Sequence, residues 1–154
     1  MGQERDDSNL LKKHLVIPTK KKLTPNQLST GLFAWKVVKH TKSNAIVVAK
    51  NNKIISISGG QTSRVDATKI AFEKTKIPKG CVVASDAFFP FKDSIEKMAQ
   101  YKIAAIIQPG GSIRDSEVVE SCNKNKIAMA FTGFRVFKHC LLYTSPSPRD
   151  YGTS

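Results

Sequence analysis

The sequence predicts a three-layer α/β domain in which a mixed β-sheet is flanked by helices. A short apolar strand, a loop and an amphipathic helix recur along the chain with short connections, as they do in sheets covered by helices. Two β-branched runs separated by four polar residues add a hairpin, and with it antiparallel strands. A chain of 154 residues can bury about 70% of its extended surface around one core.

The first half of the chain predicts one helix and the hairpin. A helix is expected over residues 24–40, because Thr24 is a suitable N-cap and Pro25 suits the first helical position. The strands of the hairpin are expected at residues 45–49 and 54–57. Asparagines between them accept the positive φ that a tight turn requires. Residues 1–22 have little periodicity and are expected to form an arm that packs on something larger.

The second half predicts helices that alternate with buried strands. The strands are expected at residues 81–84, 103–107 and 127–131, and the helices at residues 65–74, 94–100 and 115–124. In the first of these helices Ile70 and Ala71 are expected to face inward. Loops that follow strands, at Gly60, Phe88, Gly111 and Gly133, can lie along one rim. One rim makes one site, because open α/β sheets bind ligands at strand ends.

Residues 85–93 place phenylalanines and a proline between two carboxylates at a strand-to-helix junction. The apolar residues of this loop are Phe88, Phe89, Pro90 and Phe91. They would offer flat apolar surface beside an acid, which suits a ligand site. In the structural alternative the phenylalanines are core, Asp86 is a helix N-cap and Asp93 is a first-turn acid. The sequence leaves both readings open.

The formal net charge of +13 makes a basic nucleic-acid-binding module the alternative function. The lysines are spread along the whole chain, however, except for residues 12–13 and 20–22, and this is typical of a solvated surface. Three widely spaced cysteines favour reduced thiols in the cytoplasm. No apolar run approaches the roughly 20 residues of a membrane span.

The pattern of histidines and cysteines argues against a zinc site, because it contains no His-x-Glu and no Cys-x-x-Cys. What remains is a set of loop residues suited to holding a ligand: Asn44, Arg64, Asp93, Ser112 and Arg135, with Phe88, Pro90 and Phe91 as walls. Each of them also has a structural explanation. Asn44 would be a turn residue, Arg64 and Arg135 surface cations, and Ser112 a helix cap.

Five collinear stretches, at residues 33–45, 60–64, 84–93, 108–115 and 128–135, resemble one known family. They are similar to the C-terminal part of the bifunctional purine-synthesis enzymes that combine AICAR transformylase with IMP cyclohydrolase, and the resemblance covers residues 1–139. It implies a cytidine-deaminase-like subdomain without zinc. It also implies formyl transfer from 10-formyltetrahydrofolate to AICAR, in a cytoplasmic homodimer that shares its sites between subunits.

The resemblance assigns roles to individual residues. Asn44, Arg64, Phe88 and Arg135 correspond to nucleotide-binding positions, and Val65, Asp93, Ser112 and Ile113 to folate-binding positions. An amide such as that of Asn44 can hydrogen-bond a developing oxyanion, and a carboxylate such as that of Asp93 can accept hydrogen bonds from a pterin. Neither metal nor nucleic acid is expected as a partner.

Two departures from the family shape the expected activity. The catalytic Lys-His pair of the family falls upstream of Met1, and both Lys39-His40 and Lys138-His139 fall at other positions. The cyclohydrolase domain is absent as well, so the chain is expected to be inactive alone. Residues 140–154 follow the point where family members end, and they are expected to be a non-native, disordered tail.

Overall fold

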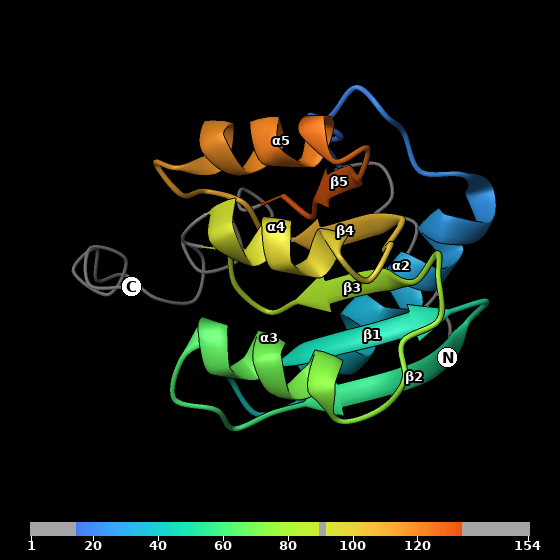
Figure 1. Cartoon of the computed structure of the whole chain (residues 1–154), viewed down its shortest axis with the longest axis vertical. Helices are drawn as coiled ribbons and strands as arrows, with labels where there is room; N and C mark the ends of the chain where they lie inside the picture. The colour runs from blue at the N-terminus through green and yellow to red at the C-terminus, as the bar shows by residue number, and fades with distance from the viewer. Residues whose placement is uncertain (1–14, 90–91, 134–154) are drawn as a thin grey trace, which may run out of the picture.

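The computed structural model describes residues 15–89 and 92–133, which form three layers around one sheet (Figure 1). The five-stranded sheet has the order β2-β1-β3-β4-β5. Its strands are β1 (Ile46–Lys50), β2 (Lys53–Ser58), β3 (Val82–Ser85), β4 (Ala105–Gln108) and β5 (Ala128–Phe131). The helices are α2 (Pro25–Lys39), α3 (Arg64–Glu73), α4 (Lys92–Ala99) and α5 (Asp115–Lys124). Every expected helix and strand is present, with ends that differ by at most two residues.

The sheet is mixed, as predicted. Strand β1 is antiparallel to both β2 and β3, whereas β3, β4 and β5 are parallel to one another. Helix α2 covers one face, and α3, α4 and α5 cover the other (Figure 1). Each face buries its own apolar cluster. No helix in the described ranges combines the length and apolar character needed to cross a bilayer.

Two local predictions are confirmed in detail. The side chain of Thr24 accepts a hydrogen bond from the backbone N–H of Gln27 at 3.1 Å, and the side chain of Gln27 accepts one from the backbone N–H of Thr24 at 3.0 Å. This capping box starts α2 with Pro25 in its first turn. In the hairpin, Asn51 and Asn52 have φ values of 52° and 61°. Both asparagines therefore adopt the left-handed conformation that the two-residue turn requires.

The orientation of α3 corrects one prediction. Ala71 is buried as expected, but Ile70 is 37% exposed. Arg64, Ala67, Ala71 and Phe72 form the buried face instead, together with Thr68. Their spacing of three and four residues is that of one helical face, and Ile70 falls outside it. The burial of a charged residue at the first position of the helix sets this face.

Residues 15–22, called the arm below, pack along the open edge of β5. Val16 and Phe131 exchange two backbone hydrogen bonds of 3.0 and 2.7 Å. The hydroxyl of Thr19 accepts a hydrogen bond from the buried backbone N–H of Met129 at 2.9 Å. This part of the expected arm therefore packs on its own domain. Residues 1–14 lie outside the described residues.

Two lysines of the arm stabilise the fold by donating hydrogen bonds to backbone oxygens. Lys21 Nζ donates to the carbonyl oxygen of Lys126 at 3.2 Å. Lys22 Nζ donates to the carbonyl oxygens of Ile17 and Thr19 at 3.0 and 2.9 Å. Two of the lysines at residues 20–22 thus bind backbone oxygens, which weakens this cluster as a signal for nucleic-acid binding.

Candidate functional site

The register of the strands brings several loops to one edge of the sheet. Ile46, the first residue of β1, pairs with Ser58 and Ser85, the last residues of β2 and β3. Gln108 and Phe131, which end β4 and β5, pair with each other. The segments that enter β1 and leave the other four strands therefore share one edge. We call this edge the rim.

Arg64 and Asn44 are in direct contact at the rim. The Nη2 of Arg64 donates to Asn44 Oδ1 at 2.8 Å, and its Nη1 donates to the carbonyl oxygen of Ala45 at 3.0 Å. Nη1 also lies 2.7 Å from Asp86 Oδ1, and the two side chains are only 7% and 12% exposed. Arg64 is therefore not the surface cation of the structural alternative.

Asp86 is the centre of this cluster and is not the N-cap of a helix. Its Oδ2 accepts a hydrogen bond from the hydroxyl of Ser43 at 2.7 Å. Its Oδ1, besides pairing with Arg64, accepts the backbone N–H of Ala45 at 3.2 Å. Sequence reasoning placed Asp86 either beside an apolar ligand site or at a helix N-cap, and it did not predict the contact with Arg64, because nothing local indicates partners so distant in the chain.

The amide of Asn44 ties the segment before β1 to the segment after β2. Its Nδ2 donates to the carbonyl oxygen of Gln61 at 3.0 Å, and its backbone N–H donates to the same oxygen at 3.1 Å. Gly60 N–H donates to the carbonyl oxygen of Lys42 at 2.6 Å. These bonds hold Asn44 beside the start of α3, where Arg64 begins the helix.

The phenylalanines after β3 have different environments. Phe89 is buried in the core, whereas Phe88 is 41% exposed at the rim. The backbone N–H of Phe89 donates to Oε1 of the buried Gln108 at 3.2 Å. Gln108 was not singled out from the sequence, although a glutamine that ends the apolar strand β4 is a signal that could have been used. Pro90 and Phe91 lie outside the described residues.

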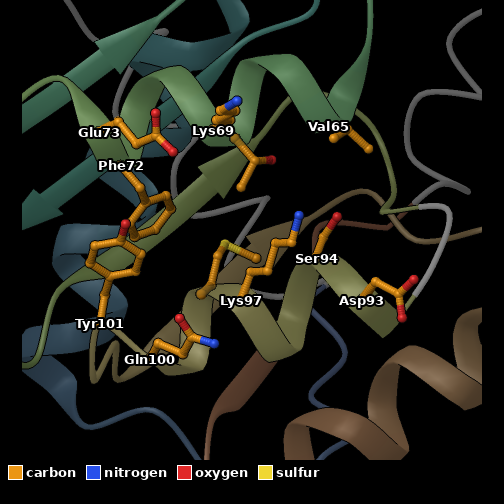
Figure 2. Close-up of a pocket in the computed structure, with 11 residues that line it drawn as sticks. Val65, Lys69, Phe72, Glu73, Asp93, Ser94, Lys97, Gln100 and Tyr101 are labelled. Atoms are coloured by element: carbon orange, nitrogen blue, oxygen red, sulfur yellow. The ribbon is translucent and has the colours of Figure 1, made fainter.

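A cavity of about 480 Å³ opens between α3 and α4. Val65 and Asp93 both line it, at the ends of the two helices nearest the rim (Figure 2). Phe72 and Tyr101 meet at its other end, with ring centroids 4.8 Å apart. Its remaining lining residues are Thr68, Lys69, Glu73, Ser94, Lys97, Met98 and Gln100. Asp93 is also the first-turn acid of α4, as the structural alternative stated.

Ser112 and Ile113 lie on a neighbouring loop, between β4 and α5. The hydroxyl of Ser112 accepts the N–H of Arg114 at 3.0 Å. The carboxylate of Asp115 accepts the N–H groups of Gly111 and Ser112 at 2.8 and 3.2 Å. Ile113 is 98% exposed. Neither Ser112 nor Ile113 lines the cavity, and Arg135 lies outside the described residues.

The two cysteines within the described residues offer no reactive thiol. Cys81 and Cys122 are buried and form no disulfide. Burial raises the pKa of both thiols, and that of Cys122 to about 12. Thiols with raised pKa values are poor nucleophiles at neutral pH. Among residues 15–89 and 92–133, no three His, Cys, Asp or Glu side chains gather in a way that could hold a metal ion.

The fold and the rim together define an α/β protein with a polar cluster and an adjacent cavity at one edge of a mixed sheet. The family described as AICARFT/IMPCHase bienzyme matches residues 1–74. The chain is 54% identical over 139 residues to the bifunctional purine biosynthesis protein PurH of Aquifex aeolicus. The matched residues make up 88% of this chain and 28% of that protein.

Two further PurH proteins give similar matches. The protein of Acetivibrio thermocellus is 56% identical over 126 residues, 81% of this chain and 24% of the relative. The protein of Petrotoga mobilis is 60% identical over 108 residues, 70% of this chain and 21% of the relative. The chain is therefore similar over most of its length to one part of these PurH proteins, and its first 74 residues match the AICARFT/IMPCHase bienzyme family. It spans about a quarter of their length.

Proposed function

We propose that residues 1–139 are the C-terminal part of a transformylase domain in purine biosynthesis. In this proposal the rim holds AICAR and 10-formyltetrahydrofolate while the formyl group passes to the exocyclic amine of AICAR. The observation that carries the proposal is the arrangement of adjacent residues at the start of α3. Arg64 contacts Asn44, and Val65 lines the same cavity as Asp93.

The polar cluster suits the nucleotide. Arginine carries five N–H donors; the hydrogen bonds of Arg64 to Asn44 and Ala45 use two of them, and Nη1 also pairs with Asp86 at 2.7 Å. Donors therefore remain for a carbonyl or anionic oxygen. The exposed ring of Phe88 can stack on a flat imidazole. Arg135 completes the proposed nucleotide set.

The cavity between α3 and α4 suits part of the folate. Its volume of about 480 Å³ lies within the range of about 300–1,000 Å³ that is usual for small-molecule sites. The carboxylate of Asp93 can accept hydrogen bonds from the N–H groups of a pterin, and Val65 supplies apolar contact. Ser112 and the exposed Ile113 would approach the folate from the neighbouring loop.

The transfer proceeds by attack of the amine of AICAR on the formyl carbon. The carbonyl oxygen gains negative charge, and an N–H of Asn44 can stabilise it by donating a hydrogen bond. The carbon–nitrogen bond to the folate then breaks, the leaving nitrogen takes up the proton that the amine loses, and tetrahydrofolate is released. No metal takes part in the proposed step. We propose that neither Lys39-His40 nor Lys138-His139 takes the role of the family's Lys-His pair, and that this chain binds both ligands without catalysing transfer alone.

Calorimetry with AICAR and with 10-formyltetrahydrofolate tests the binding half of this proposal. Asp93→Ala should weaken folate binding, and Arg135→Ala should weaken nucleotide binding. Salt-sensitive binding to polynucleotides that ignores Asp93→Ala would instead support the basic nucleic-acid-binding module. Formyl-transfer turnover by the isolated chain would refute the proposal that this chain does not catalyse transfer alone.

The proposed setting is a homodimer in the cytoplasm. The buried, unpaired Cys81 and Cys122 suit a compartment in which thiols stay reduced. Sedimentation of the purified protein measures its assembly, and a monomer at every concentration would contradict the dimer.

A further inference from the structure

Asp86 connects the three chain segments that build the polar cluster of the rim. Its carboxylate contacts Ser43 and Ala45 before β1 and Arg64 at the start of α3. Its own backbone N–H donates to the carbonyl oxygen of Ala45 at 3.4 Å. We propose that Asp86 is a positioning residue, which holds the guanidinium of Arg64 and residues 43–45 in one arrangement for nucleotide binding. This inference rests on the proposed function.

A carboxylate is required at this place because Arg64 is charged, buried and unfavourably located. A buried guanidinium must be paired, since the loss of its hydration is otherwise uncompensated. Arg64 is also the first residue of α3, where the helix dipole disfavours positive charge. The Oδ1 of Asp86, 2.7 Å away, supplies the opposite charge. An amide in its place would leave the guanidinium free to turn toward solvent.

The order of Asn44 depends on the same carboxylate. Asn44 Oδ1 receives its hydrogen bond from Arg64, and the residues on either side of Asn44 are both bonded to Asp86. A change at Asp86 thus reaches both proposed nucleotide-binding residues together. The proposed folate residue Asp93 lies on a different element, α4, and lines the cavity between α3 and α4. The effect on the two ligands should therefore differ.

The test compares four variants of the full chain. Asp86→Asn removes the charge and keeps the shape, whereas Asp86→Glu keeps the charge on a longer side chain. Ser43→Ala removes only the hydrogen bond from the Ser43 hydroxyl to Asp86 Oδ2. Glu120→Gln makes the same chemical change at an exposed position on α5 and serves as the control. Nuclear magnetic resonance measures hydrogen exchange of the Arg64 Nε–H without ligand, and calorimetry measures the Kd of AICAR and of 10-formyltetrahydrofolate.

Asp86→Asn should speed exchange of the Arg64 Nε–H at least about tenfold and weaken AICAR binding about 10- to 100-fold, as expected for lost hydrogen bonds to a charged group. In Asp86→Asn the Kd for the folate should change less than about twofold. Glu120→Gln should change neither the exchange rate of the Arg64 Nε–H nor the Kd of either ligand. Asp86→Glu should recover part of the AICAR affinity. Equal losses for both ligands, or unchanged exchange and AICAR affinity, would overturn the inference.

Two further outcomes separate the inference from the proposed function. If the unmodified chain binds no AICAR, the proposed function fails, and the exchange rates still decide whether Asp86 orders Arg64. If Asp86→Asn does not fold, the AICAR affinity of Ser43→Ala decides whether Asp86 is a positioning residue. Loss of one hydrogen bond to a charged oxygen should weaken AICAR binding several-fold, and an unchanged affinity would contradict the role of Asp86.

Discussion

Replacing Thr19 by valine should destabilise the domain by loosening the arm from β5. Thr19 is almost fully buried, and its hydroxyl accepts the N–H of Met129 at 2.9 Å and donates to the carbonyl oxygen of Lys21 at 2.8 Å. Valine keeps the shape and the β-branch of threonine but offers no polar atom. The substitution therefore isolates the two hydrogen bonds.

The expected loss follows from the burial of the groups that remain. Met129 is fully buried, so its N–H would lose the acceptor that Thr19 supplies in the core, at a cost of about 1–3 kcal/mol. The lost bond to the carbonyl oxygen of Lys21 adds about 1 kcal/mol. The free energy of unfolding should thus fall by about 2–4 kcal/mol. For a domain of this size that lowers Tm by about 6–12 °C.

Urea unfolding and amide hydrogen exchange measure this effect. The N–H of Met129 should exchange faster in Thr19→Val, while the N–H of Ala128, bonded to Ala104 at 3.1 Å, should change less. Thr19→Ser retains the oxygen and should cost less than about 1 kcal/mol. The reasoning is refuted if the valine variant is as stable as the unmodified protein, or if serine costs as much as valine.

Three further predictions concern the site and the core. Phe89→Ala should lower the free energy of unfolding by about 3–5 kcal/mol, whereas the exposed Phe88→Ala should cost less than about 1 kcal/mol and weaken AICAR binding; urea unfolding and calorimetry measure both. Asp93→Asn should weaken 10-formyltetrahydrofolate binding about tenfold and leave Tm nearly unchanged. The raised pKa of Cys122, about 12 against an ordinary 9.0, means that the folded state holds this proton more tightly. Stability should be unaffected below pH 9 and fall between pH 9 and 12, and Cys122→Ala should flatten that slope in urea titrations.

Features that depend on neighbouring residues could be predicted from the sequence. The N-cap at Thr24 and the left-handed turn at Asn51 and Asn52 are both set by side chains within four positions. The mixed sheet followed from the hairpin and the repeated strand-loop-helix pattern. The family resemblance, carried by residues on several loops, is confirmed by the relatives.

Features that depend on tertiary contacts could not be predicted. Ile70 looked like an inward residue because its hydrophobicity was considered without the burial of Arg64, which needs Asp86 from the loop after β3. Phe88 and Phe89 are adjacent in a loop, where no periodicity distinguishes an exposed ring from a buried one. The separation of these rings follows from the bond between the Phe89 backbone and Gln108.

The hairpin explains why the polar cluster can form at all. Because β1 is antiparallel to β3, the chain enters β1 at the same edge where β3 ends. Strand β2 then returns the chain to that edge, directly before α3. Asn44 and Arg64 thus meet at one end of the hairpin, and Asp86 joins them from the end of β3. If β1 ran parallel to β3, Asn44 would lie at the opposite edge of the sheet, and neither the contact with Arg64 nor the proposed nucleotide site could exist.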